Sequence, residues 1–153
     1  MELKATPEVT AFAVDSKDYR TDPTVLAHFP TVDPKVVPLG ARVLVQLVSP
    51  RQKTASGLIL VEETKETERW NNQVARVIAV GPLAFCNRET AEPWKEGMWA
   101  EPGDFVIVPR WGGNRRTVKS EDGSMIVYFA VVNDHEIIEK VYGNPLDLET
   151  FIL

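Results

Sequence analysis

Short runs of apolar residues alternate with turn residues along the middle of the chain. The runs are rich in branched and aromatic residues, which favour strands, and pairs such as Gly-Pro, Pro-Gly and Asp-Gly separate several of them. No long window shows the apolar period that is typical of a helix. The pattern predicts an all-β fold, a small barrel or a sandwich, with strands at residues 42–48, 74–80, 105–108, 115–119, 125–132 and 137–141.

Two connections between the expected strands are unusually long. They span residues 49–72 and 81–103, whereas most connections in compact domains have about 4–6 residues. Connections of this length usually carry function or lack order. We therefore expect the function of the protein to involve at least one of them.

The two ends of the chain differ from the middle. Residues 1–36 hold four of the 11 prolines, which argues against long regular elements there. This N-terminal arm also contains apolar residues, so it is expected to lie on the domain or to reach a neighbouring molecule. Residues 143–153 form a C-terminal tail that opens with turn residues and ends in Phe151-Ile152-Leu153.

The apolar run Leu58–Val61 lies inside the first long connection, between two polar stretches. One interpretation is a buried strand, and the other is an exposed segment that binds another protein. The run does not alternate with polar residues, and a stretch rich in glutamate follows it, which favours the binding segment. Burying three large aliphatic side chains contributes roughly 5–9 kcal/mol, and ordering five loop residues costs about as much. One copy would bind weakly, but several copies on a ring would bind firmly.

The composition fits a globular protein of one domain. The chain has 153 residues, of which 44% are hydrophobic, and carries a net charge of −5, so no general basic face points to nucleic acid or an anionic membrane. No apolar run approaches the ~20 residues of a membrane helix. The first residues lack the features of a signal or transit peptide, and the single cysteine, Cys86, fits a reducing cytosol. We expect a cytoplasmic protein.

Few residues suggest catalysis. His28, His135 and Cys86 do not form a recognised zinc spacing, and no nucleotide-binding or nucleophile motif occurs. The glutamates after Leu58–Val61 are best explained as a solvated charged loop. The basic, aromatic stretch Arg110–Arg116 is either a turn with cation–π packing of Trp111 or a clamp for single-stranded nucleic acid, and the acidic chain favours the turn. We expect no enzyme activity, no catalytic residue, no metal site and no cofactor.

The order of these features resembles the GroES family, the small co-chaperonins that cap chaperonin rings. Val37–Val45 has the Pro-Leu that precedes the first strand of that family, and Ser56–Leu60 has the glycine and apolar tripeptide of its mobile loop. Arg76–Gly81 matches a strand that ends in Val-Gly, and Gly103–Val108 matches a Gly-Asp before an apolar strand. Met125–Val141 resembles the closing segment. The resemblance covers residues 37–141, and the ordered set of motifs is more specific than any one of them.

The resemblance implies a small, partly open GroES-like β-barrel over residues 37–142, with a mobile loop at about 49–72 and a roof hairpin at about 81–103. It implies assembly as a dome-shaped homo-oligomer, a heptamer in this family. The partner is a GroEL-type chaperonin, which supplies the nucleotide, and non-native substrate proteins are enclosed under the dome. By resemblance, the chaperonin-binding residues are Gly57, Leu58, Ile59 and Leu60.

The resemblance also implies a subunit interface and marks several departures. In the family the first strand of one subunit pairs with the last strand of the next, which corresponds here to Val43, Leu44, Val45, Ile137, Ile138 and Val141. The roof loop is longer than usual and carries aromatic residues that either pack on the loop itself or present an apolar surface. Trp111 stands near a family residue that faces the chamber. The arm and tail have no counterpart in short members, which is compatible with a phage-encoded version in a host cytoplasm.

A second hypothesis keeps the barrel but not the activity. The chain would then be a structural or assembly adaptor, for example a viral protein, with Leu58–Leu60 packed against its own barrel. An enzyme built on the GroES-like barrel of zinc dehydrogenases is disfavoured, because the chain has neither a metal-ligand cluster nor a dinucleotide fingerprint.

Overall fold

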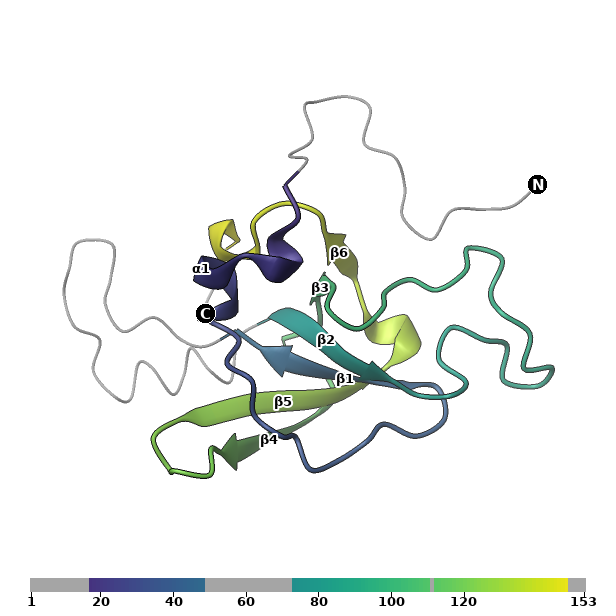
Figure 1. Cartoon of the computed structure of the whole chain (residues 1–153). Coiled ribbons are helices and arrows are strands. Elements are labelled where there is room, and N and C mark those ends of the chain that lie inside the picture. Colours follow the sequence, from purple (N-terminus) through teal and green to yellow (C-terminus); the bar gives the residue numbers. More distant parts are fainter. Residues whose placement is uncertain (1–16, 49–72, 111, 149–153) are drawn as a thin grey trace.

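The structure is a computed structural model of the chain, and it describes residues 17–48, 73–110 and 112–148. These residues form one antiparallel sheet of six strands in the order β4-β5-β1-β2-β3-β6 (Figure 1). The two end strands do not pair with each other, so the sheet is open. The predicted all-β class is confirmed, and each expected strand is present: β1 (Arg42–Leu47), β2 (Val74–Val80), β3 (Phe105–Ile107), β4 (Asn114–Lys119), β5 (Ile126–Asn133) and β6 (Glu139–Val141).

Strand β1 lies at the centre of the sheet and is buried on both faces. Val43, Val45 and Leu47 point to the main core, and Leu44 joins a second cluster with Val127 and Phe129. Successive side chains of a strand point to opposite faces, so a continuous apolar run is expected for a strand such as β1 that is buried on both faces. The N-terminal arm covers part of the second face, because Val32 and Val36 pack on this cluster.

The described part of the arm folds into two short helical turns, η1 (Tyr19–Thr21) and α1 (Pro23–Leu26). Each turn begins after an aspartate whose carboxylate accepts a backbone N–H, Asp18 from Arg20 and Asp22 from Thr24. Such caps satisfy N–H groups that a first turn leaves without partners. Proline follows Asp22 at the first position of α1, where its fixed φ suits a helix start.

The arm and the tail meet over strands β3 and β6 (Figure 1). Val25 and Phe29 of the arm are buried against Phe105 of β3. Val141 of β6 and Leu146 of the tail turn η3 (Pro145–Asp147) pack on the same cluster. The buried amide of Gln46 on β1 also donates to the carbonyl of Pro30 at 2.8 Å. The arm was expected either to lie on the domain or to reach a neighbouring molecule, and its described part lies on the domain.

The turn between β4 and β5 has the Asp-Gly pair that predicts a hairpin. Oδ1 of Asp122 accepts hydrogen bonds from the Ser120 hydroxyl at 2.6 Å, the Ser124 hydroxyl at 2.7 Å and the Ser124 N–H at 3.0 Å. These hydrogen bonds favour the ionised carboxylate and lower the pKa of Asp122 to about 2. Gly123 follows with a φ of +72°, a backbone conformation that residues with a side chain rarely adopt.

We expect the Asp122 carboxyl to titrate near pH 2 in the folded protein. Since the folded pKa lies below the unfolded value of 3.8, the contribution of this turn is present above about pH 4 and is lost as the pH falls toward 2. Replacing both Ser120 and Ser124 by alanine should move the pKa of Asp122 back toward 3.8. Carbon-detected NMR titration of the carboxyl measures this, and an unchanged pKa in the double variant would contradict the assignment.

Candidate functional site

The segment expected to bind the chaperonin is attached to two paired strands. Residues 49–72 connect β1 to β2, where Leu47 pairs with Ala75 and the Val48 N–H donates to the Val74 carbonyl at 3.0 Å. The segment thus leaves and re-enters the sheet at one place. Val48 also packs on the cluster that the arm and tail form. The predicted chaperonin-binding residues Gly57, Leu58, Ile59 and Leu60 lie outside the described residues.

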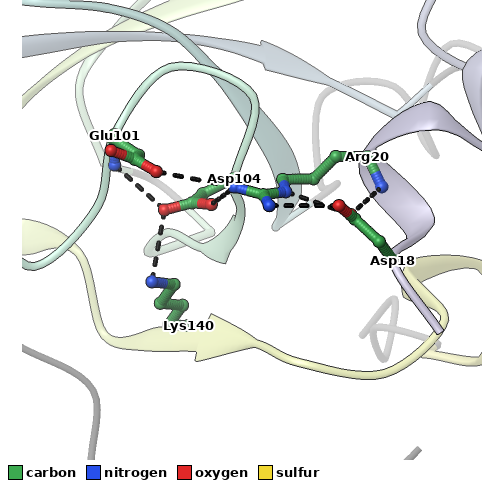
Figure 2. A network of polar contacts seen from close by, with 5 residues as sticks. All are labelled: Asp18, Arg20, Glu101, Asp104 and Lys140. Carbon is green, nitrogen blue, oxygen red and sulfur yellow. Dashed lines mark hydrogen bonds and ion pairs between the residues drawn. The ribbon is translucent and has the colours of Figure 1, made fainter. Parts of the chain in front are cut away.

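A polar network fastens the arm to the turn before β3 and to β6 (Figure 2). Its centre is the Asp104 carboxylate, which is 5% exposed and accepts the Glu101 N–H at 3.0 Å. Lys140 of β6 approaches it at 3.2 Å and Arg20 of the arm at 3.5 Å. Arg20 also pairs with Asp18 at 3.0 Å, and this hydrogen bond raises the pKa of Arg20 and lowers that of Asp18. The network joins the arm, the end of the roof segment and the last strand.

Replacing Asp104 by asparagine should lower the free energy of unfolding by about 1–3 kcal/mol, because hydrogen bonds to a buried charged group are worth more than neutral ones. The Arg20 contact adds little, since that side chain is 45% exposed and screened by solvent. Glu101→Gln is the matched control, and it should change stability by less than about 0.5 kcal/mol because its carboxylate is exposed. Urea unfolding at equal chain concentration measures both variants, and equal effects would contradict a central role for Asp104.

The roof segment, residues 81–103, is built around its own aromatic side chains. Phe85 is 1% exposed and meets Trp94 edge-to-face with ring centroids 5.5 Å apart, and Trp94 meets Trp99 at 4.7 Å. The buried carboxylate of Asp134 accepts the Phe85 N–H at 2.9 Å and so ties this cluster to the end of β5. Met98 remains 42% exposed. The loop therefore packs on itself and still shows an apolar side chain at its surface.

The roof segment contains less regular pairing than a hairpin of two strands. Cys86 and Pro93 form an isolated bridge, and the remaining contacts are turns. The segment begins at Gly81, whose N–H donates to the Arg42 carbonyl at 2.8 Å. A Cβ at Gly81 would collide with the carbonyl oxygen of Gly40, which explains why the Val-Gly motif ends in glycine.

The residues expected at the subunit interface fall into two groups. Val43, Leu44 and Val45 of β1 are fully buried, and β1 is hydrogen bonded to β2 on one edge and β5 on the other. A strand with both edges paired has no free backbone groups for another chain, so this structure does not offer β1 as the pairing strand. Ile137, Ile138 and Val141 lie at or beside β6, an end strand whose outer edge is unpaired within the described residues.

Exposed apolar side chains gather just before β1 and at β6. Val37 is 75% exposed, Leu39 is 65% exposed and Ile138 is 56% exposed. Such side chains are common singly on monomers, but a sheet edge next to them is a template for pairing with a second chain. The segment that precedes β1 is therefore a better candidate for contact with a neighbour than β1 itself.

The candidate metal ligands and the basic stretch Arg110–Arg116 can be compared with the described residues. Within residues 17–48, 73–110 and 112–148, no three His, Cys, Asp or Glu side chains are placed to hold a metal ion. In the basic stretch, Arg115 donates to the backbone carbonyls of Pro109 at 2.8 Å and Gly112 at 3.2 Å, and its burial lowers its pKa. This arrangement favours the turn interpretation. Trp111, the candidate chamber-facing residue, lies outside the described residues.

Among the helices that the structure describes, none is both long and apolar enough to cross a membrane.

Comparisons with known proteins agree with the fold and with the order of the motifs. The sequence profile of the family described as "Chaperonin 10 Kd subunit" matches residues 35–140. The chain is 37% identical over 107 residues to the mitochondrial 10 kDa heat shock protein of Saccharomyces cerevisiae, covering 69% of this chain and 88% of that protein. It is 30% identical over 112 residues to the co-chaperonin GroES of Methylacidiphilum infernorum, covering 73% of this chain and 99% of that protein. The chain belongs to the chaperonin 10 Kd, or GroES, family.

The structure adds residues that sequence reasoning did not find. Asp104 stood in a recognised Gly-Asp motif, but its partners Arg20 and Lys140 are 84 and 36 residues away in the sequence. Asp134 followed a strand and had no motif of its own. No local pattern pointed to either carboxylate as a tie between elements, since both act through contacts between distant parts of the chain.

Proposed function

We propose that this chain is a co-chaperonin that caps a GroEL-type chaperonin ring in a nucleotide-dependent way and encloses non-native protein for folding. Membership of the chaperonin 10 Kd family carries this proposal. The chain has no active site of its own in this account. It acts by binding the ring, in the cytoplasm that contains its partner, while the partner hydrolyses the nucleotide.

The attachment of residues 49–72 supports the proposed contact with the ring. The segment starts and ends at paired positions of β1 and β2, so it is anchored to the most buried strand of the sheet. Leu58, Ile59 and Leu60 are proposed to enter an apolar groove of the chaperonin. Each contact is weak because ordering the segment costs about as much free energy as burying three aliphatic side chains returns. A ring of copies binds tightly, because the weak contacts act together.

The ring is proposed to be a heptamer in which β6 lies against the neighbouring subunit. The outer edge of β6, which pairs with no other described strand, and the exposed Ile138 supply one side of this interface, and Val37 and Leu39, which precede β1, supply the other. This arrangement keeps β1 inside its own sheet. It also covers the three most exposed apolar side chains among the described residues.

The proposed function is tested by titrating the chain into a bacterial GroEL-type chaperonin and measuring ATP hydrolysis. We expect saturable inhibition that needs nucleotide, with an end point near one chain per chaperonin subunit of the capped ring. If the chain is inert, and protease cleaves residues 49–72 no faster than the rest of the domain, then the adaptor hypothesis replaces the co-chaperonin.

A further inference from the structure

A cavity lies between the roof segment and His135, which follows β5. The cavity has a volume of about 700 Å³, and its lining includes Trp94, Trp99, Pro93, Glu92, Glu96 and His135. This volume lies within the range of pockets that bind small molecules, about 300–1,000 Å³. Two indole rings and two carboxylates thus meet at one hollow of the surface.

The walls of this cavity are fixed before any ligand binds. The Trp94 N–H donates to the Phe85 carbonyl at 2.9 Å, and the Asn87 N–H donates to the Glu92 carbonyl at 2.7 Å. The Trp94 and Trp99 rings lie against each other with an angle of 58° between their planes. A preformed site avoids the free-energy cost of ordering side chains on binding.

Trp99 is an unusual choice for a position with only a packing role. Its indole nitrogen is buried and has no hydrogen-bond partner in the part of the chain that the structure describes. An unsatisfied buried donor destabilises the folded protein, and phenylalanine would supply an aromatic ring without this cost. The large π-face of tryptophan is what the protein gains at this position, and tryptophan is the best aromatic partner for a cation.

The charges around the cavity favour a cationic ligand. Glu92 and Glu96 are exposed, and their carboxylates make no ion pair with described residues. Lys95 is the one opposing side chain of fixed charge in the lining. His135 is turned toward Asp134, with 3.5 Å between its Nδ1 and the carboxylate. With His135 neutral, the lining has a net charge of −1, on a chain whose total is −5.

We propose that this cavity binds the arginine or lysine side chain of an extended polypeptide. The indole faces of Trp94 and Trp99 take the aliphatic stem and the cation, and Glu92 and Glu96 pair with the charged head. The inference rests on the proposed function in one respect, since the extended polypeptide would come from the non-native proteins that the cap encloses. Nucleic acid does not fit, because the carboxylates repel phosphate.

The test is isothermal titration of the intact assembly with an acetylated, amidated peptide of alternating glycine and arginine. We expect saturable binding that is weakened about tenfold or more in Glu92→Gln/Glu96→Gln. The control Glu89→Gln/Glu121→Gln removes the same charge from exposed positions outside the cavity and should change the affinity less than about twofold. Lys95→Ala removes the opposing charge and should tighten binding about two- to threefold.

Three results would overturn the proposal. The first is that no binding is detected at about 1 mM peptide. The second is that both double variants weaken binding equally, which would indicate general attraction to an acidic protein. Tetramethylammonium chloride binding as tightly as the peptide is the third, because the ligand would then be a small cation. The titration contains neither chaperonin nor nucleotide, so a negative result does not bear on the proposal that the chain caps a ring. Conversely, if the chain binds the peptide but does not cap a ring, the cavity proposal stands and the capping proposal fails.

Discussion

Replacing Ile59 by aspartate should abolish the nucleotide-dependent inhibition of chaperonin ATP hydrolysis. The substitution brings a carboxylate into an apolar groove without a partner, which costs at least about 3 kcal/mol per subunit. In the proposed ring several subunits bind at once, so these costs add and lower the overall affinity by many orders of magnitude. The measurement is the same ATPase titration that tests the wild-type chain.

Thr64→Asp is the matched control for this variant. It places the same charge in residues 49–72, but outside the apolar run and beside existing glutamates. It should retain inhibition within about threefold of the wild-type midpoint. Equal inhibition by Ile59→Asp and Thr64→Asp would show that Leu58–Leu60 is not the segment that enters the chaperonin.

Replacing Phe29 by alanine should lower the free energy of unfolding by about 3–5 kcal/mol. Phe29 is 1% exposed, and its ring lies 5.2 Å from that of Phe105 on β3. The deletion leaves a cavity between the arm and the sheet, where Val25 and Leu146 also pack. We therefore expect the arm to detach at lower denaturant concentration and to expose the end of β6.

Thr24→Ala is the control for Phe29→Ala, because Thr24 is exposed and lies in α1, the turn of the arm that precedes Phe29. Its effect should stay within about 0.5 kcal/mol. Both variants are compared by urea unfolding at one chain concentration, since assembly makes apparent stability depend on concentration. A loss below about 1 kcal/mol for Phe29→Ala would contradict the account of the arm as part of the folded unit.

The strands were predictable because their signals are local. The runs at β1, β2 and β5 are rich in branched residues, and the Asp122-Gly123 pair marks the turn between β4 and β5. A run of branched residues and the turn residues that bound it lie within a few positions of each other. The family resemblance rests on the same local motifs, and the match to residues 35–140 confirms it.

The arrangement of the strands and the role of the arm were not predictable in the same way. The sequence places β1 first among the strands, but nothing in its pattern shows that β5 and β2 pair with its two edges. Contacts such as Phe29 with Phe105 join residues that are far apart in the sequence. These contacts depend on how the whole chain folds. The pattern of apolar and polar residues could therefore identify the residues that are buried, but not which of them contact each other.

The proposed chaperonin-binding run Leu58–Leu60 stays a prediction, because it lies outside the described residues. It stands out because its neighbours are polar, which is a property of the sequence alone. The roof cavity, in contrast, needs Trp94, Trp99 and His135 in one place, and His135 belongs to a different part of the chain. Sequence reasoning noted the tryptophans but left open whether they pack on the loop or face outward.

Native mass spectrometry of a GroEL-type chaperonin mixed with this chain tests the central claim most directly. In the presence of ADP, the account predicts a complex that contains one chaperonin and a ring of about seven copies of this chain, and it predicts free chaperonin when nucleotide is left out. Detection of the chain only as a monomer, or of no complex with nucleotide present, would contradict the proposal that it caps a chaperonin ring.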